Sequence, residues 1–247
     1  MKYIESKFRR SHTRAVMAGL MGLWLASGTA EAATVFFTDS LSFGAAAPVP
    51  LSVQTFEGVP AGTAVPQGTP FQGITYNSNL GGLGLEVSNV FATTSGTNYL
   101  GATDDQEFLS GHELTFSFGP LAAFGLFIIA SPGDVLANDF QLVAPGGSMF
   151  NAGTPERVLS DGREVFFLGV TNTDAFNGAQ LLSFGDPDDP FFGFQIDDIA
   201  TGAVPEPASY ALIGAGLALL GLARRFSGSR GKHNNVISNA HVEKEGN

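Results

Sequence analysis

Residues 113–118 read Glu-Leu-Thr-Phe-Ser-Phe, and this alternation decides the fold that we expect. Successive side chains of a β-strand point to opposite faces, so Leu114, Phe116 and Phe118 share one face and the polar residues share the other. A strand with one apolar face is typical of an antiparallel sheet that covers a core on one side only. Residues 194–197, Phe-Gln-Ile-Asp, begin with the same pattern.

Apolar segments of strand length recur along residues 34–199, separated by clusters of Gly, Pro, Asn and Asp. No stretch between them has a convincing helical period of apolar residues. We therefore predict an all-β fold, an antiparallel two-sheet sandwich of the jelly-roll type. The predicted strands are Thr34–Thr38, Ser52–Glu57, Gly73–Asn77, Leu83–Val90, His112–Phe118, Ala123–Ala130, Phe140–Val143, Glu164–Thr171, Gln180–Phe184 and Phe191–Ile199.

Phenylalanine is the expected core filler of this sandwich. Of the 22 Phe residues, only Phe8 and Phe226 lie outside residues 33–204. Large rings of this kind supply much of the apolar area that a core buries. The single Trp precedes the sandwich, which leaves Tyr76 and Tyr99 as its candidates for a sugar-binding platform. This composition argues against a strong sugar-binding face.

The predicted sandwich is strongly acidic. Residues 33–204 contain two basic residues, Arg157 and Arg163, against 18 Asp and Glu, which gives a net charge of −16. Nucleic acids and anionic membrane surfaces attract positive charge, so neither is an expected partner. The chain has no Cys, which excludes disulfides, thiolate metal sites and a Cys nucleophile.

The first 32 residues have the parts of a secretory signal peptide. An apolar run spans residues 15–28, and Ala30-Glu31-Ala32 fits an A-x-A cleavage site. We predict a signal peptide at 1–32, export by the Sec route and a mature chain that starts at Ala33. The alternative is an uncleaved N-terminal anchor. The basic residues that precede the apolar run are Lys2, Lys7, Arg9, Arg10 and Arg14.

The other end of the chain has a second apolar segment between an extended tripeptide and a basic pair. Pro205-Glu206-Pro207 follows Val204, and its two prolines favour extended backbone. The uncharged run 208–223 reaches about 24 Å as a helix, close to the thickness of a bilayer core. Arg224 and Arg225 favour retention of the C-terminal residues on the cytoplasmic side. We predict a transmembrane helix in the inner membrane, and a disordered polar tail at 226–247.

This combination of Pro-Glu-Pro, short apolar helix and Arg pair resembles the PEP-CTERM sorting signal of exopolysaccharide-producing Gram-negative bacteria. The resemblance covers residues 203–225 and implies that an exosortase, a membrane-embedded transpeptidase, processes the chain near residues 205–207. The sequence also divides into a passenger domain at 33–202 and a short tether at 200–204. Short passenger segments such as Thr55-Phe56-Glu57-Gly58 are similar to segments of other PEP-CTERM passengers, which favours a β-sandwich and implies no activity.

Calcium is the metal that the acidic residues favour. The first and last strands of a jelly roll can pair at one edge, so we expect Glu57 and Asp197 or Asp198 to come together there. If Asp197 points inward, its buried carboxylate needs either a cation or hydrogen bonds. The competing interpretation is that the Asp-rich segments form turns.

Catalytic patterns are weak, so we do not expect an enzyme. His112 is the one His of residues 33–204, and no G-x-S-x-G or H-E-x-x-H pattern accompanies it. The leading hypothesis is a non-enzymatic protein of the cell surface or extracellular matrix. Through the family resemblance, we expect it to be linked to exopolysaccharide or biofilm. The alternatives are a carbohydrate-binding module with structural calcium and, less favoured, a secreted hydrolase.

Overall fold

The structure is a computed structural model that describes residues 33–185, 191–204 and 214–220. The chain divides into a compact unit that ends at Ala203 and a second unit that starts at Val204. The predicted signal peptide 1–32, the tripeptide 205–207, Arg224, Arg225 and the polar tail 226–247 lie outside the described residues.

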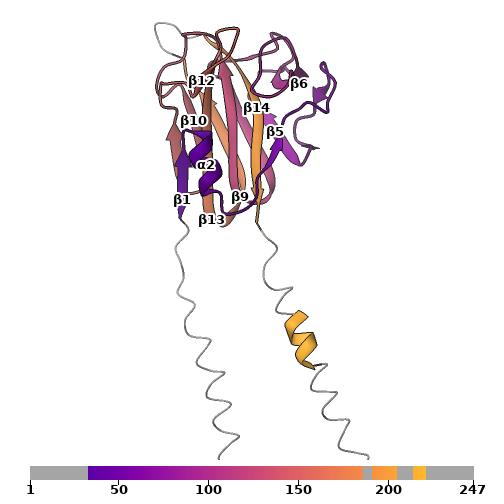
Figure 1. Cartoon of the computed structure of the whole chain (residues 1–247). Helices are drawn as coiled ribbons and strands as arrows, with labels where there is room; N and C mark the ends of the chain where they lie inside the picture. The colour runs from indigo at the N-terminus through magenta and orange to yellow at the C-terminus, as the bar shows by residue number, and fades with distance from the viewer. Residues whose placement is uncertain (1–32, 186–190, 205–213, 221–247) are drawn as a thin grey trace, which may run out of the picture. The chain divides into compact units, whose positions relative to one another are not determined.

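Within the first unit, the described residues form 14 antiparallel-paired strands and one short helix, which confirms the all-β prediction (Figure 1). The elements are β1 (Thr34–Phe37), α2 (Ser40–Ala46), β2 (Ser52–Gln54), β3 (Ala64–Val65), β4 (Pro70–Phe71), β5 (Ile74–Ser78), β6 (Leu85–Ser88), β7 (Tyr99–Ala102), β8 (Phe108–Leu109), β9 (Glu113–Ala130), β10 (Phe140–Ala144), β11 (Gly147–Phe150), β12 (Arg157–Val158), β13 (Glu164–Ser183) and β14 (Gly193–Ala203).

The two longest strands, β9 and β13, pair along most of their length and then fold back on themselves. The register of their pairing shifts between Thr171 and Gly178, where the ladder is irregular. The rings of Phe116 and Phe118 lie 5.2 and 5.1 Å from the ring of Phe124, within the same strand. A straight strand would separate residues 116 and 124 by about 26 Å. The two halves of β9 therefore face each other across the core.

This bend generates two layers from shared strands. The first layer contains β4, β5, the first half of β9, the second half of β13, β10 and β11. The second layer contains β1, the first half of β13, the second half of β9, and β14 with β2, β7 and β8 beside it. The sandwich is confirmed, but the prediction of two separate sheets is wrong, because β9 and β13 connect the layers by hydrogen bonds. The jelly-roll connection stays a prediction.

Several predicted strand ends differ from the structure. The segments 112–118 and 123–130 fall in one strand, β9, because the chain bends at Gly119 and Pro120 without ending the strand. The segments 164–171 and 180–184 likewise fall in β13, which ends at Ser183 and is irregular between Thr171 and Gly178. The segment 52–57 is a strand only to Gln54, since Phe56 has a φ of 62° and turns the chain. The short strands β3, β4, β7, β8, β11 and β12 lie outside the predicted segments.

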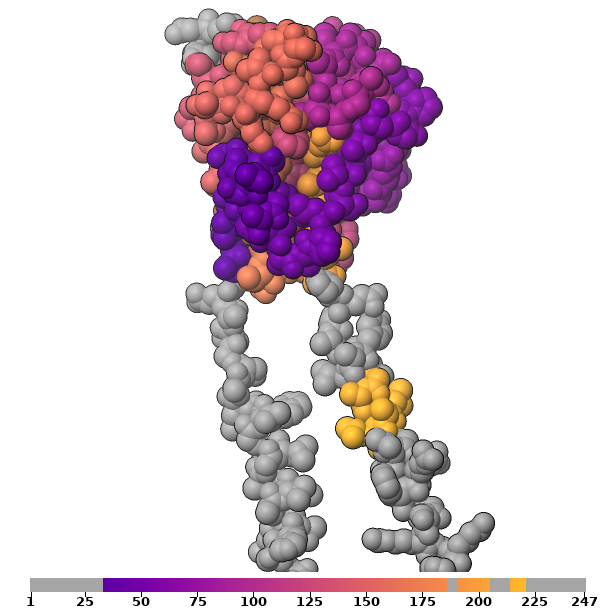
Figure 2. Space-filling view, viewed as in Figure 1, coloured from indigo at the N-terminus to yellow at the C-terminus, as the bar shows by residue number. Residues whose placement is uncertain are grey.

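The expectation of no helix is wrong at α2. Asp39 caps this helix by accepting a hydrogen bond from the Ser42 N–H at 2.7 Å. Phe43 then inserts its ring between Phe37 and Phe167, with centroid distances of 5.8 and 5.2 Å. The helix thus closes the outer face of the second layer, and Figure 2 shows the indigo segment that contains it lying over the unit. Seven residues are too few for a helical period to stand out in the sequence.

The chain enters and leaves the sandwich at the same end (Figure 1). Thr34 pairs with Asn172, and Ala203 pairs with Leu121, so both lie beside the bend of β9 and β13. The last strand runs to Ala203, beyond its predicted end at Ile199, and the predicted tether 200–204 is reduced to Val204.

Of the predicted transmembrane segment 208–223, the structure describes residues 214–220, and these are helical. Among the described residues, none of the helices has both the length and the apolar character needed to cross a bilayer.

Candidate functional site

The polar side chains of the sandwich converge on one irregular segment, residues 91–98, which we call the anchored loop. It connects β6 to β7 and reads Phe-Ala-Thr-Thr-Ser-Gly-Thr-Asn. Short hydroxyl and amide side chains favour local hydrogen bonds over a strand ladder, which explains why β6 ends before it. Its Gly96 has a φ of 59°, and a Cβ there would collide with the Glu57 carboxylate. The loop is therefore built to lie directly against acidic groups.

Asp197 and Asp198, at the centre of β14, hold the middle of the anchored loop. Asp197 is fully buried, and its Oδ2 accepts hydrogen bonds from the N–H groups of Thr94 and Ser95 at 3.0 and 3.1 Å. Its Oδ1 accepts from the Asp198 N–H at 2.8 Å. The Ser95 hydroxyl donates to Asp198 Oδ1 at 2.6 Å. Asp198 has a φ of 48°, and the same residue marks a register shift in the β14–β9 pairing.

Glu57 holds the end of the same loop. Its Oε1 accepts hydrogen bonds from the N–H groups of Thr97 and Asn98 at 2.8 and 2.7 Å. The Asn98 amide donates in turn to the Val59 carbonyl at 2.8 Å. The strand that leads to Glu57, β2, pairs with β14 through Gln54 and Ile199. The first strand, β1, pairs with β13, so the predicted pairing of the first and last strands is wrong although the carboxylates meet.

The three predicted calcium ligands thus meet on one loop, but each faces hydrogen-bond donors. Among residues 33–185, 191–204 and 214–220, no group of three or more His, Cys, Asp or Glu side chains is arranged to hold a metal ion. Burial of Asp197 needed a cation or hydrogen bonds, and the structure supplies hydrogen bonds. The calcium site at Glu57, Asp197 and Asp198 stays a prediction.

The carboxyl of Asp197 titrates far from its ordinary range. Burial, and after it the charge of Asp198, raise the pKa of Asp197 from 3.8 to about 7, although the hydrogen bonds from Thr94, Ser95 and Asp198 oppose the shift. The folded state therefore binds this proton more tightly than the unfolded chain does. The stabilisation from that proton is complete below about pH 4 and is lost as the pH rises through 7.

We expect the variant Asp197→Asn to remove this pH dependence. The quantity to follow is the free energy of unfolding of the native chain minus that of the variant. As the pH rises from 4 to 8, this difference should fall, by at most about 4 kcal/mol. Urea unfolding at a series of pH values, with a chelator present to exclude bound cations, measures the difference. The test is how this difference in free energy changes with pH. Altered hydrogen bonds in the variant also change its stability, but by an amount that is the same at every pH. A difference that is flat over this range would contradict the raised pKa.

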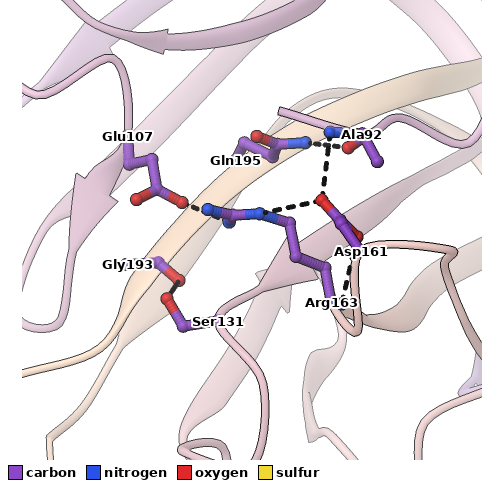
Figure 3. A network of polar contacts seen from close by, with 7 residues as sticks. All are labelled: Ala92, Glu107, Ser131, Asp161, Arg163, Gly193 and Gln195. Carbon is purple, nitrogen blue, oxygen red and sulfur yellow. Dashed lines mark hydrogen bonds and ion pairs between the residues drawn. The ribbon is translucent and has the colours of Figure 1, made fainter. Parts of the chain in front are cut away.

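A second set of contacts fixes the beginning of the anchored loop, around the buried Arg163 (Figure 3). Its guanidinium forms an ion pair with Glu107 and lies 3.5 Å from the Asp161 carboxylate through Nε. The guanidinium carbon also lies 3.8 Å from the centre of the Phe91 ring. Two carboxylates and one aromatic face thus compensate the cost of burying the positive charge of Arg163.

The same network reaches the loop backbone at Ala92 (Figure 3). The Ala92 N–H donates to Asp161 Oδ2 at 3.3 Å, and the Gln195 amide donates to the Ala92 carbonyl at 2.6 Å. Ser131 and Gly193 are joined beside it by a hydrogen bond of 3.2 Å. The loop is thus attached to β14 through Gln195 and Asp197, and to the segment before β13 through Asp161 and Arg163.

The residues considered for catalysis and sugar binding have structural roles. His112 accepts a hydrogen bond at Nδ1 from the Leu109 N–H at 2.9 Å, and burial lowers its pKa. Tyr76 and Tyr99 are fully buried, so neither forms a sugar-binding platform. Sequence reasoning missed Arg163 as an anchor. The sequence did contain an indication of this role. Arg163 is one of only two basic residues in residues 33–204, a segment with a net charge of −16, so carboxylate partners for it were to be expected.

The family model of the PEP-CTERM protein-sorting motif matches residues 203–225. This confirms the resemblance seen at the C-terminal end, and the chain carries that sorting motif. The match begins at Ala203, the last residue of β14. Val204, Pro205, Glu206, Pro207, Arg224 and Arg225 all fall within the matched range.

No curated protein matches the chain. Among solved structures, the chain is similar to the C-terminal family 22 carbohydrate-binding module of Clostridium thermocellum Xyn10B, with 14% sequence identity and a TM-score of 0.23. The similarity covers 63% of this chain and 95% of that one. A likeness at this level carries no argument about the fold or the ligand.

Proposed function

We propose that the protein is an exported, non-enzymatic component of the cell surface or extracellular matrix, linked to exopolysaccharide or biofilm. The sorting motif implies processing by an exosortase and sorting through the membrane toward the cell surface. The observation that carries the proposal is that this motif starts at the last residue of β14. A cut near residues 205–207 then leaves every strand pairing of the sandwich intact.

The chemistry of the sandwich supports a binding or structural role over catalysis. The buried carboxylate of Asp197 and the buried guanidinium of Arg163 are each occupied by contacts within the fold. His112 has a backbone donor on Nδ1. A net charge of −16 over residues 33–204 keeps such a domain soluble and repels copies of itself and other anions.

Sorting predicts a defined C-terminus. We expect protein released from the cell surface to start at Ala33 and to end near residues 205–207, as measured by intact-mass analysis. In cells without the exosortase, the chain should stay membrane-bound and end at Asn247. Released protein that still ends at Asn247 in exosortase-containing cells would contradict the proposal.

A triple variant sharpens this experiment. Replacing Pro205, Glu206 and Pro207 by Ala should abolish most of the release, because the extended tripeptide is lost while residues 33–203 are unchanged. Three Ala substitutions at Ser227, Gly228 and Ser229, in the polar tail, form the matched control and should process normally. Equal release of both triple variants would show that the tripeptide is not required.

A further inference from the structure

An uncharged cleft opens on the sandwich beside the bend of β9. Its volume is about 280 Å³. It lies between β2 of the second layer and the turn from β4 to β5 of the first layer, with the bend of β9 between them. The residues of β9 in its lining are Phe118, Gly119 and Leu121.

The lining combines amides and hydroxyls with an apolar wall. Gln54 and Gln72 carry amides, and Ser52 and Thr201 carry hydroxyls. None of the described residues that line the cleft is charged, although residues 33–204 contain 18 Asp and Glu. The ligand that suits such a lining is neutral, with an apolar face and several hydroxyl groups at its edge.

Gln54 connects the cleft to the buried Tyr76. Its Oε1 accepts a hydrogen bond from the buried Tyr76 hydroxyl at 3.1 Å, which joins the two layers at the base of the cleft. Its Nε2 is buried and has no hydrogen-bond partner among the residues that the structure describes. Buried amide N–H groups rarely stay unpaired, but solvent does not reach this atom, so an acceptor in the cleft pairs with it only when the Gln54 side chain turns.

We propose that this cleft binds a single neutral sugar unit. The apolar wall of Ile74, Phe118 and Leu121 would take the ring face. The Gln72 amide and the hydroxyls of Ser52 and Thr201 would bind its hydroxyls. The volume is slightly below the roughly 300–1,000 Å³ of pockets for drug-sized ligands, which suits one ring. The inference rests on the proposed function, because an exopolysaccharide matrix would supply the sugar. Beyond that function, it names the binding site and the class of ligand.

Gly119 offers a way to close the cleft without disturbing the fold. A Cβ at Gly119 meets nothing within 4 Å, and its φ lies outside the left-handed region. The variant Gly119→Leu therefore places a side chain at the cleft. The matched control is Gly44→Leu, at a position in α2 that is equally open and does not line the cleft.

The test is a titration of the full chain, purified in a zwitterionic detergent that contains no sugar. The probes are cellobiose, maltose and N,N′-diacetylchitobiose, with digalacturonic acid as the anionic comparison. We expect at least one neutral probe to bind at millimolar concentrations and digalacturonic acid not to bind. Gly119→Leu should weaken binding at least tenfold, or about 1.4 kcal/mol, with an unchanged midpoint of thermal unfolding. Gly44→Leu should bind as the native chain does.

Several outcomes would overturn the inference. These are no binding of any neutral probe, equal binding by Gly119→Leu, or capture of an extended peptide by the cleft in place of a sugar. Because the titration uses unprocessed chain, its failure is distinct from a failure of sorting, which only the intact masses report.

Discussion

Replacing Phe124 by Ala should lower the free energy of unfolding by about 3–5 kcal/mol. Phe124 is fully buried, and its ring lies 5.2 Å from Phe116 and 5.1 Å from Phe118. The substitution removes a ring from the place where the two halves of β9 meet, so the surrounding strands cannot close the cavity without changing the bend. Urea unfolding, followed by circular dichroism, measures the loss.

Phe191→Ala is the matched control for this prediction. The Phe191 side chain is 73% exposed, so the same change of residue type should shift the free energy of unfolding by no more than about 0.5 kcal/mol. A similar small effect at Phe124 would mean that the two halves of β9 do not face each other.

The second large effect is expected at Arg163. The variant Arg163→Met keeps a long side chain but removes the charge, which leaves the Glu107 carboxylate without its partner. Breaking one side of a buried ion pair costs about 3–5 kcal/mol of stability. Arg163 is 7% exposed, and Phe91 and Asp161 lose their contacts with it at the same time.

Two further variants test whether the cost comes from the unpaired charge. Arg157→Met changes the other basic residue of the module, which is exposed, and should cost less than about 1 kcal/mol. In a double-mutant cycle, Glu107→Gln added to Arg163→Met should cost less than the sum of the single changes, because neither charge is then left alone. Additive effects would show that Arg163 and Glu107 are not coupled.

The sequence predicted the layers of this fold better than the connection between them. Alternation in residues 113–118 correctly placed Leu114 and Phe116 in the core. The same alternation cannot show that the strand continues through Gly119 and Pro120, since these residues usually end a strand. Only the contact between Phe116 and Phe124, which are eight positions apart, reveals that the strand bends and continues.

The candidate site was also only partly predictable, because the sequence shows its carboxylates but not the residues that they contact. The alternation of residues 194–197 places Asp197 on the face opposite Ile196, so its burial entered the sequence analysis only as a condition, and the structure buries both faces of β14 there. The need to compensate a buried charge followed from that condition. The donors that meet it, Thr94 and Ser95, lie about a hundred positions earlier in a segment with no period of its own. Long-range partners of this kind leave no local pattern, and the same holds for Arg163 and Glu107.

The position of β14 within the second layer has a consequence for export. This strand is the last of the sandwich in the chain, yet it lies between β9 on one side and β2, β7 and β8 on the other. A chain that crosses the membrane from its N-terminus lacks this interior strand until Ala203 has emerged. The edges of β9 and β2 that pair with β14 stay without their ladder hydrogen bonds during that time, and most pairings span long separations in sequence, which slows folding. If the chain crosses the membrane unfolded, as the predicted Sec route requires, folding is completed only after residues 33–203 have been translocated, when the sorting motif reaches the membrane.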